Sequence, residues 1–488
     1  MKMRFSHRFW LVAILSIISI WGALGERTPF NSGLGWDGKN YAFLTADFER
    51  MALAKEIDSY QYKRILTPLV IFYAAKLFHI ELSIDTIPYV FRVFNLLLIG
   101  CVVWLFFKLC SHFNFKPYTE IIGFTALFFN YFILKNTPYY PVLTDISGFW
   151  IGMIICYLFL KQQKVALFFS VLLSHFTFPL LLLTSIPLIA NIRNNNLLIS
   201  LQSTSLFRVI TVLSLLTMLS LIALILFQPT LLDPKYTMTI HQYALPLSIL
   251  WVLFYQWKLL MSFQQPGFME GTIEWKKSLV LTIGIVGFIL LVNYGIAQIS
   301  IPENRFTPQV FLFNIIQQSI SYPFVSIVAH SIYFGPAIML MLLYFKPIIQ
   351  SIKQQGDSAV VYFIVITLFC LGSESRQFVP YYPFLVVMLM LAINSFSFTR
   401  RQVILFVILS ILFSKCWFPI NVPGIFESYD FGNFPDQRYF MNHGPFMSKL
   451  SYLINLGIAL IMGGCIYLVF RKTELSNTNF TESSIPSL

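Results

Sequence analysis

Residues 88–108 read PYVFRVFNLLLIGCVVWLFFK, a long apolar run interrupted by Arg92 and closed by Lys108. About 20 apolar residues in an α-helix cross roughly 30 Å of hydrocarbon. The stretch therefore predicts a membrane-spanning helix, with a hydrophobic surface on all sides.

Similar runs recur along the whole chain, and they predict an all-α, polytopic membrane protein. Counting them gives about fourteen spans, or about thirteen if residues 165–191 form one helix. All lie in a single transmembrane domain, residues 1–472. The expected spans are 9–25, 88–108, 118–134, 143–160, 165–177, 178–191, 207–228, 245–262, 278–299, 323–345, 359–373, 378–396, 403–420 and 449–470.

The composition agrees with this class. Of the 488 residues, 57% are hydrophobic and 11% are charged, whereas soluble domains carry about 25% charged residues. The net charge of +12 comes from cations that stand singly or in pairs at the ends of apolar runs. That pattern is typical of cytoplasmic anchoring, so we expect membrane lipids as neighbours and no nucleic acid. The six cysteines show no C-x-x-C spacing, so neither a zinc site nor a disulfide framework is indicated.

The positive-inside rule orients the spans. With Met1 inside and residues 165–191 split in two, the basic loops all fall on the cytoplasmic side. A single helix there would put every later basic loop outside. We therefore expect a tip at Ser174–Thr177 on the outer side. The inside cations are then Lys108, Lys116, Lys161, Lys164, Arg193, Lys276, Lys277, Lys346, Lys353, Arg400, Arg401, Arg471 and Lys472.

The long connections fall on the outer side under this arrangement. They are 26–87, 135–142, 229–244, 300–322 and 421–448. Loops longer than about 15 residues in compact proteins are usually functional or disordered, and these are rich in aromatic residues and proline, so we expect them to be folded. The polar segment 473–488 is predicted to be a disordered cytoplasmic tail.

The longest connection carries two notable motifs. Its first, Gly33-Leu34-Gly35-Trp36-Asp37-Gly38-Lys39-Asn40-Tyr41, surrounds one carboxylate with glycines. Asp37 is either exposed to an approaching substrate or caps a helix starting near Tyr41. The second places Lys63 and Arg64 before an apolar stretch, 69–80, that is too short to span and predicts an interfacial helix. The two cations either meet a lipid phosphate or serve as interfacial anchors.

Together these motifs resemble the GT-C superfamily of membrane glycosyltransferases, especially its bacterial mannosyl- and arabinosyltransferase type. The resemblance rests on Trp36-Asp37-Gly38-x-x-Tyr41 and Tyr62-Lys63-Arg64-Ile65-Leu66-x-Pro68 after a first helix, and it covers residues 9–190. It implies an inverting enzyme of the bacterial inner membrane that works at the periplasmic face. The donor would be a polyprenyl-phosphate-linked sugar, and the acceptor a lipid, a glycan or a protein. It also implies that the N-terminal segment is a retained helix, although its charges and its Ala23-Leu24-Gly25 end also fit a cleavable signal peptide.

The resemblance further implies roles for the acidic residues. Asp37 corresponds to the catalytic base, with Trp36 and Tyr41 beside it as substrate contacts. Asp145 corresponds to a second acidic residue from the next outer connection, although it also fits a simple helix cap. Some family members use a divalent metal, so Mg²⁺ or Mn²⁺ is allowed as a cofactor.

The resemblance likewise implies a set of donor contacts. Arg376, before a proline-rich span, corresponds to a residue that holds the donor phosphate, and Arg64 and Lys63 would join it. Glu374 would then contact substrate, or it would merely neutralise Arg376. His175 stands at a tip where related sequences often have a Lys-Glu pair, so we expect either a substrate contact or a satisfied buried histidine.

The chemistry of the reaction needs these residue types. An attacking hydroxyl needs a base, and the departing phosphate needs cations, for which the forked guanidinium is best suited. Two other classes stay open. An O-antigen-type polymerase or ligase would concentrate Arg and His in a late outer loop, whereas a transporter of lipid-linked substrates would carry charges in mid-span.

Overall fold

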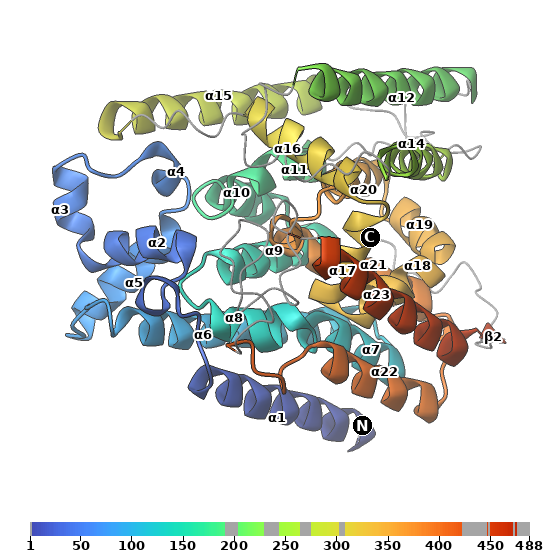
Figure 1. Cartoon of the computed structure of the whole chain (residues 1–488), viewed down its shortest axis with the longest axis horizontal. Helices are drawn as coiled ribbons and strands as arrows, with labels where there is room; N and C mark the ends of the chain where they lie inside the picture. The colour runs from blue at the N-terminus through green and yellow to red at the C-terminus, as the bar shows by residue number, and fades with distance from the viewer. Residues whose placement is uncertain are drawn as a thin grey trace.

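The computed structural model describes residues 2–190, 204–228, 244–263, 275–301, 308–421, 447, 449–471 and 474–475, without the side chains of 2–6, 36, 190, 204–210, 275–279, 308–309 and 474–475. It is almost entirely helical, as predicted. Figure 1 shows most of the long helices running along the same general direction, with the small helices of the first connection at one end and strand β2 at the other.

The first part of the chain begins with helix α1 (Lys2–Leu24). The first connection then holds η1 (Phe30–Gly33), α2 (Trp36–Ala46), α3 (Phe48–Leu53), α4 (Ser59–Tyr62) and α5 (Leu66–Leu77). The next helices are α6 (Ile87–His112), α7 (Pro117–Phe128), η2 (Phe132–Asn136), α8 (Thr137–Tyr139), α9 (Asp145–Leu160), α10 (Lys164–Ser174) and α11 (Pro179–Ala190).

The second part continues with α12 (Thr204–Phe227), α14 (Leu245–Met261), α15 (Trp275–Ile299), α16 (Pro308–Ser321), α17 (Val325–Phe334), α18 (Pro336–Leu343), α19 (Phe345–Gln354) and α20 (Asp357–Phe369). It ends with η4 (Ser375–Tyr381), α21 (Tyr382–Ile393), strand β1 (Phe396–Ser397), α22 (Arg400–Phe413), α23 (Lys449–Phe470) and strand β2 (Glu474–Leu475). Helix α21 and its neighbours form the centre of the main core, while α12, α14 and α16 pack around a second cluster.

Residues 165–191 form two helices, α10 and α11, which confirms the predicted division. Their connection lies against the first outer connection, because the amide of Leu66 donates a hydrogen bond of 3.0 Å to the carbonyl of Phe176. The start of the outer connection expected at 300–322 also contacts the first connection, because the amide of Ile301 donates to the carbonyl of Ile57 at 3.0 Å. These segments, expected on one side of the membrane, therefore contact one another.

Segments expected on the cytoplasmic side also come together. The amide of Lys116 donates to Oδ1 of Asn394 at 3.0 Å, and Nε2 of Gln402 donates to the carbonyl of Val469 at 2.9 Å. Strands β1 and β2 pair in antiparallel fashion nearby. Strand β2 falls at the start of the segment expected to be a disordered tail. The rest of that tail lies outside the described residues.

The number and length of the spans differ from the prediction. Within the described residues, five helices are long and apolar enough to cross a membrane, or six if α16 and α17, bent by 96°, count as one. The other apolar helices are shorter. Most of the expected outer connections 229–244 and 421–448 lies outside the described residues, and α16 occupies much of the connection expected at 300–322.

Two predicted spans are broken for identifiable reasons. The span expected at 118–134 stops at Phe128, where the amide group of Asn130 donates to the carbonyls of Ala126 and Leu127, and its carbonyl accepts from the amide of Ile133. A side chain that satisfies the free backbone groups makes such a break stable in an apolar setting. The span expected at 323–345 breaks at Gly335, whose φ of +71° is accessible to glycine.

Membrane orientation gives a first testable prediction. We expect a cysteine at Asn40, which is exposed in the first connection, to react with an impermeant maleimide added to intact cells. A cysteine at Lys353, in the last turn of α19, should react only after the membrane is opened. The reverse labelling pattern would invert the assignment of the outer face.

Candidate functional site

Three segments that are far apart in the sequence bring Asp37, Asp145 and Arg376 together. Nε of Arg376 donates to Oδ2 of Asp145 at 2.9 Å, and its Nη2 donates to Oδ1 of Asp145 at 3.4 Å. Nη1 and Nη2 both lie 3.4 Å from Oδ2 of Asp37. One guanidinium therefore bridges two carboxylates, from the first turn of α2 and the first residue of α9.

Close backbone packing allows this meeting. A Cβ atom on Gly38 would lie 2.7 Å from the carbonyl oxygen of Val142, so glycine lets α2 approach the segment that leads into Asp145. A Cβ atom on Gly152 would lie 1.9 Å from the carbonyl oxygen of Pro380, so a second glycine lets α9 approach η4. Asp37 itself lies inside α2, which begins at Trp36, and this corrects the expectation of a helix starting near Tyr41.

The two carboxylates differ in their access to solvent. The side chain of Asp37 is 46% exposed and that of Asp145 is 5% exposed. Asp145 also lies at a helix N-terminus, where its charge is stabilised by the backbone dipole. Asp145 can therefore serve as a fixed anchor for Arg376, and Asp37 is the member of the pair that a substrate can reach.

Glu374 adds a fourth charge. Burial raises its pKa above the ordinary value, and the charge of Arg376 opposes that shift only in part. Among the described residues, the ion pairs of Arg376 are with Asp37 and Asp145 and not with Glu374. The charge of Glu374 acts on Arg376 without a direct ion pair, so both expectations for Glu374, a substrate contact or neutralisation of Arg376, stay predictions.

A divalent metal does not fit this arrangement. The guanidinium of Arg376 occupies the position between the two carboxylates that a bound cation would take. Over the part of the chain that the structure describes, no group of three or more His, Cys, Asp or Glu side chains is placed to hold an ion. We derive no step through a metal.

Arg64 lies beside this cluster as an unpaired cation. Its guanidinium carbon is 4.6 Å from the ring centroid of Tyr60 and 5.3 Å from that of Phe178. The side chain is buried, Nε has no hydrogen-bond partner, and no carboxylate among the described residues pairs with it. The charges of Asp37 and Arg376 act on it, as does the buried Tyr41. A buried cation without a counter-ion is costly, so Arg64 is suited to receive an anion.

The other predicted residues lie at the edge of the cluster. His175 is 4% exposed, and burial together with the nearby charge of Lys63 lowers its pKa to about 4. It is thus a neutral, buried histidine at ordinary pH. Both ring nitrogens are buried without a hydrogen-bond partner among the described residues, so the expectation of a satisfied histidine is not confirmed. Lys63 lies close to His175. The side chain of Trp36 lies outside the described residues, so its predicted substrate contact stays a prediction.

Two residues that the sequence did not single out hold the Arg376 segment. Nδ1 of His330 lies 3.0 Å from Oγ of Ser375, and its Nε2 lies 2.9 Å from the carbonyl oxygen of Cys370. Oε1 of Gln318 accepts from the amides of Ser373 and Glu374, at 3.1 and 3.2 Å. The sequence signal that could have pointed to His330 was its position as a polar residue inside an apolar run.

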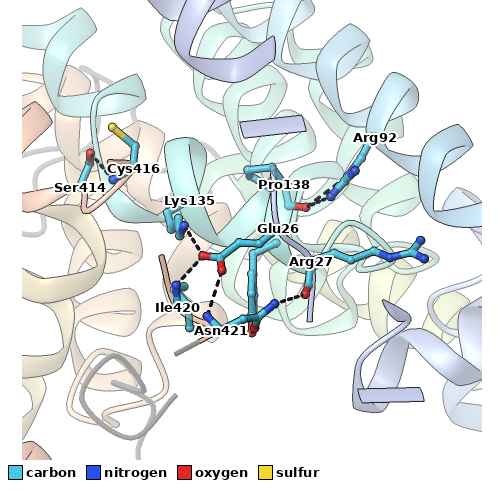
Figure 2. A network of polar contacts seen from close by, with 10 residues as sticks. Glu26, Arg27, Arg92, Lys135, Pro138, Ser414, Cys416, Ile420 and Asn421 are labelled. Carbon is cyan, nitrogen blue, oxygen red and sulfur yellow. Dashed lines mark hydrogen bonds and ion pairs between the residues drawn. The ribbon is translucent and has the colours of Figure 1, made fainter. Parts of the chain in front are cut away.

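A second polar network ties the end of α1 to the segment after α22 (Figure 2). Nζ of Lys135 donates to Oε1 of Glu26 at 2.7 Å, and the amides of Ile420 and Asn421 donate to the same carboxylate. Burial alone would raise the pKa of Glu26, but these three donors outweigh it and hold the pKa below its ordinary value. The network lines a cavity of about 250 Å³ between Trp21 and Trp417.

This network gives a pH-dependent prediction. Because the pKa of Glu26 is depressed in the folded protein, its stabilisation is complete above the unfolded pKa of roughly 4.3 and is lost as the pH falls through the lower folded-state value. Glu26→Gln should lower the free energy of unfolding at neutral pH by about 1–3 kcal/mol. Thermal melts of both proteins should therefore converge on acidification. A pH-independent difference would show that the charge of Glu26 is not what stabilises the contact.

Comparison of the chain with protein-family models, with curated proteins and with solved structures gives no match.

Proposed function

We propose that the protein is an inverting membrane glycosyltransferase of the GT-C type, which moves a sugar from a polyprenyl-phosphate donor to an acceptor hydroxyl at the outer face. One observation carries the proposal: Asp37, Asp145 and Arg376, each singled out by sequence for this chemistry, meet in one cluster although more than a hundred residues separate each from the next. Independent helix caps or interfacial anchors would have no reason to converge.

Asp37 acts as the general base in this proposal. Its exposed carboxylate accepts the proton of the acceptor hydroxyl while the hydroxyl oxygen forms a bond to the anomeric carbon. The bond between that carbon and the donor phosphate oxygen breaks on the opposite face, and its electron pair leaves with the phosphate. Because the phosphate is a good leaving group, no strong general acid is needed. Attack opposite the leaving group inverts the anomeric configuration.

Arg376 and Asp145 hold the base in place. The hydrogen bonds from Arg376 to both carboxylates fix the orientation of Asp37. Since Asp145 engages Nε and Nη2 of the guanidinium, Arg376 is positioned from the protein interior. It therefore serves mainly as a positioning residue, with its Nη atoms beside the site where the sugar would lie.

Arg64 is the better ligand for the donor phosphate. Its charge is uncompensated by any ion pair within the described chain, and its guanidinium contacts the rings of Tyr60 and Phe178. A phosphodiester would supply the missing negative charge and accept from the forked donors. The contacts with the two rings restrict the movement of the guanidinium.

Buried charges elsewhere do not favour a transport pathway. Arg92, Glu120 and Asp145 each lie in the first two turns of their helices, near a membrane surface rather than in mid-span. Transport pathways for polar substrates place such residues deep in the bilayer.

The proposal is tested by supplying labelled donors to the purified protein in lipid vesicles. We expect label to pass from polyprenyl-phosphate-linked sugars to an acceptor lipid or glycan, and not from nucleotide sugars. Transfer from a nucleotide sugar without any lipid intermediate would overturn the donor class. Transfer of a whole oligosaccharide would favour the polymerase or ligase class instead.

A further inference from the structure

Two arginines share one aromatic ring on the flank formed by α1 and α6. The guanidinium carbon of Arg27 lies 5.7 Å from the ring centroid of Tyr89, and that of Arg92 lies 5.8 Å from the same centroid. Arg27 follows the outer end of α1, and Arg92 is in the second turn of α6. Tyr89 is 56% exposed and Arg27 is partly exposed, whereas Arg92 is 8% exposed and lies beneath the surface.

No negative group compensates these two charges. Neither guanidinium forms an ion pair within the described residues, and Nη1 of Arg27 is buried without a hydrogen-bond partner. Arg92 uses Nε and Nη2 to donate to the carbonyl of Pro138, at 3.3 and 3.1 Å (Figure 2). The carboxylate of Glu26 is already used by Lys135, and Figure 2 shows the Arg27 side chain extending away from it. The positive charge of Arg27 acts on Arg92, so the two guanidiniums repel each other.

A small, mainly apolar notch adjoins Arg92. It has a volume of about 20 Å³ and is lined by Ser19, Arg92, Asn95 and Thr137 among others. Oγ of Ser19 and Oδ1 of Asn95 are both buried there without hydrogen-bond partners. A notch of this volume has room for about one water molecule, within reach of both atoms.

The surrounding surface is apolar and exposed. Leu24 on α1 is 83% exposed, and Val93 on α6 is 59% exposed. On a membrane helix such side chains face acyl chains. The flank therefore offers cations at the outer end of the helices and an apolar surface below them, which is the distribution of charge in an anionic phospholipid.

We propose that Arg27 and Arg92 bind the phosphate of an anionic glycerophospholipid from the outer leaflet, with its acyl chains along the exposed face of α1 and α6. This site differs from the catalytic cluster, because the 138–141 segment lies between them. Arg92 and Asn95 hold that segment on one side, through the carbonyls of Pro138 and Pro141, and it leads on to Asp145. The inference does not depend on the proposed transfer reaction.

The test is lipid-dependent thermal stability of the purified full-length protein in detergent. A ligand that binds the folded state raises the melting temperature in proportion to its occupancy. We expect phosphatidylglycerol to stabilise the wild type, and Arg27→Gln to need about tenfold more of it for the same shift, as befits the loss of one charged hydrogen-bond donor group. Without lipid, Arg27→Gln should melt no lower than the wild type, because it removes an uncompensated charge.

Controls separate the sources of phosphate. Arg50→Gln removes a cation of the same connection that is 58% exposed and paired with Asp47 and Glu56, and it should leave the lipid response unchanged. Arg27→Lys keeps the charge but not the forked guanidinium, so its stabilisation by phosphatidylglycerol should be intermediate. This variant also provides the comparison with the wild type if Arg27→Gln does not fold. Phosphatidylcholine and inorganic phosphate should stabilise weakly. An equal response of the wild type and both Arg27 variants, or a response to polyprenyl phosphate but not to phosphatidylglycerol, would overturn the assignment.

Discussion

Replacing Asp37 with asparagine is expected to reduce sugar transfer by about 10²–10⁴-fold, the usual loss when a general base is removed. The amide of asparagine keeps the size of the side chain and can still accept from Arg376, so the protein should insert and accumulate normally. Initial rates with a saturating lipid-linked donor measure the effect. Asp37→Glu, which keeps a carboxylate, should retain measurable activity.

Asp58→Asn is the matched control for this variant. Asp58 lies in the same connection and caps α4, where its Oδ1 accepts from the amide of Gln61 at 2.7 Å. Asparagine caps helices about as well as aspartate, so Asp58→Asn should leave both stability and activity nearly unchanged. Near-normal transfer by Asp37→Asn would refute the assignment of the base, and Asp145 or Asp58 would then have to be tested in that role.

Replacing Arg64 with alanine should raise the apparent KM for the lipid-linked donor by about 10–100-fold, with little change in the KM for the acceptor. The physical reason is the loss of a buried guanidinium near the cluster that no carboxylate of the described residues pairs with. Arg64→Lys keeps the charge but not the two-pronged contact, so it should be impaired to a smaller degree.

Arg376→Ala separates the two arginines. Because Arg376 positions Asp37, its loss should lower kcat more than it raises the donor KM. If Arg64→Ala uses the donor normally while Arg376→Ala raises the donor KM, the phosphate contact belongs to Arg376, as the resemblance alone implied. Donor and acceptor titrations on both variants decide between these outcomes.

Much of the site could be predicted because its residues stand where apolar runs end. Asp37 follows the first apolar run, Asp145 begins another and Arg376 precedes a third. Because the ends of membrane-spanning helices lie at the membrane surface, the three residues are expected at the same depth. The positive-inside rule then placed residues 165–191 as two helices, which the structure confirms. Composition and charge distribution were enough for the helices, whereas the choice of Asp37, Asp145 and Arg376 came from the resemblance to the GT-C superfamily.

Other features depend on tertiary contacts that one sequence does not reveal. The break after Phe128 is stable only because Asn130 satisfies the free backbone groups, and the pattern of apolar residues continues through it. The contact of His330 with Ser375 could not be predicted either, because the two residues come from different helices. In the sequence, Arg27 and Arg92 each resemble an ordinary interfacial anchor, and only the structure shows that both contact the ring of Tyr89. The sequence led to a proposed role for Arg64, but it did not reveal that Arg64 has no ion pair within the described residues.

The central claim is that the protein transfers a sugar from a polyprenyl-phosphate donor and that Asp37 acts in this step. Mass spectrometry of lipid-linked sugars and glycans, in a deletion strain complemented with either the wild type or Asp37→Asn, tests both parts together. We predict that the deletion strain and the Asp37→Asn strain accumulate the same polyprenyl-phosphate sugar and lack the same single residue from a glycan, and that the wild type restores both. Unchanged lipid-linked sugars and glycans in the deletion strain, or full restoration by Asp37→Asn, would contradict the account.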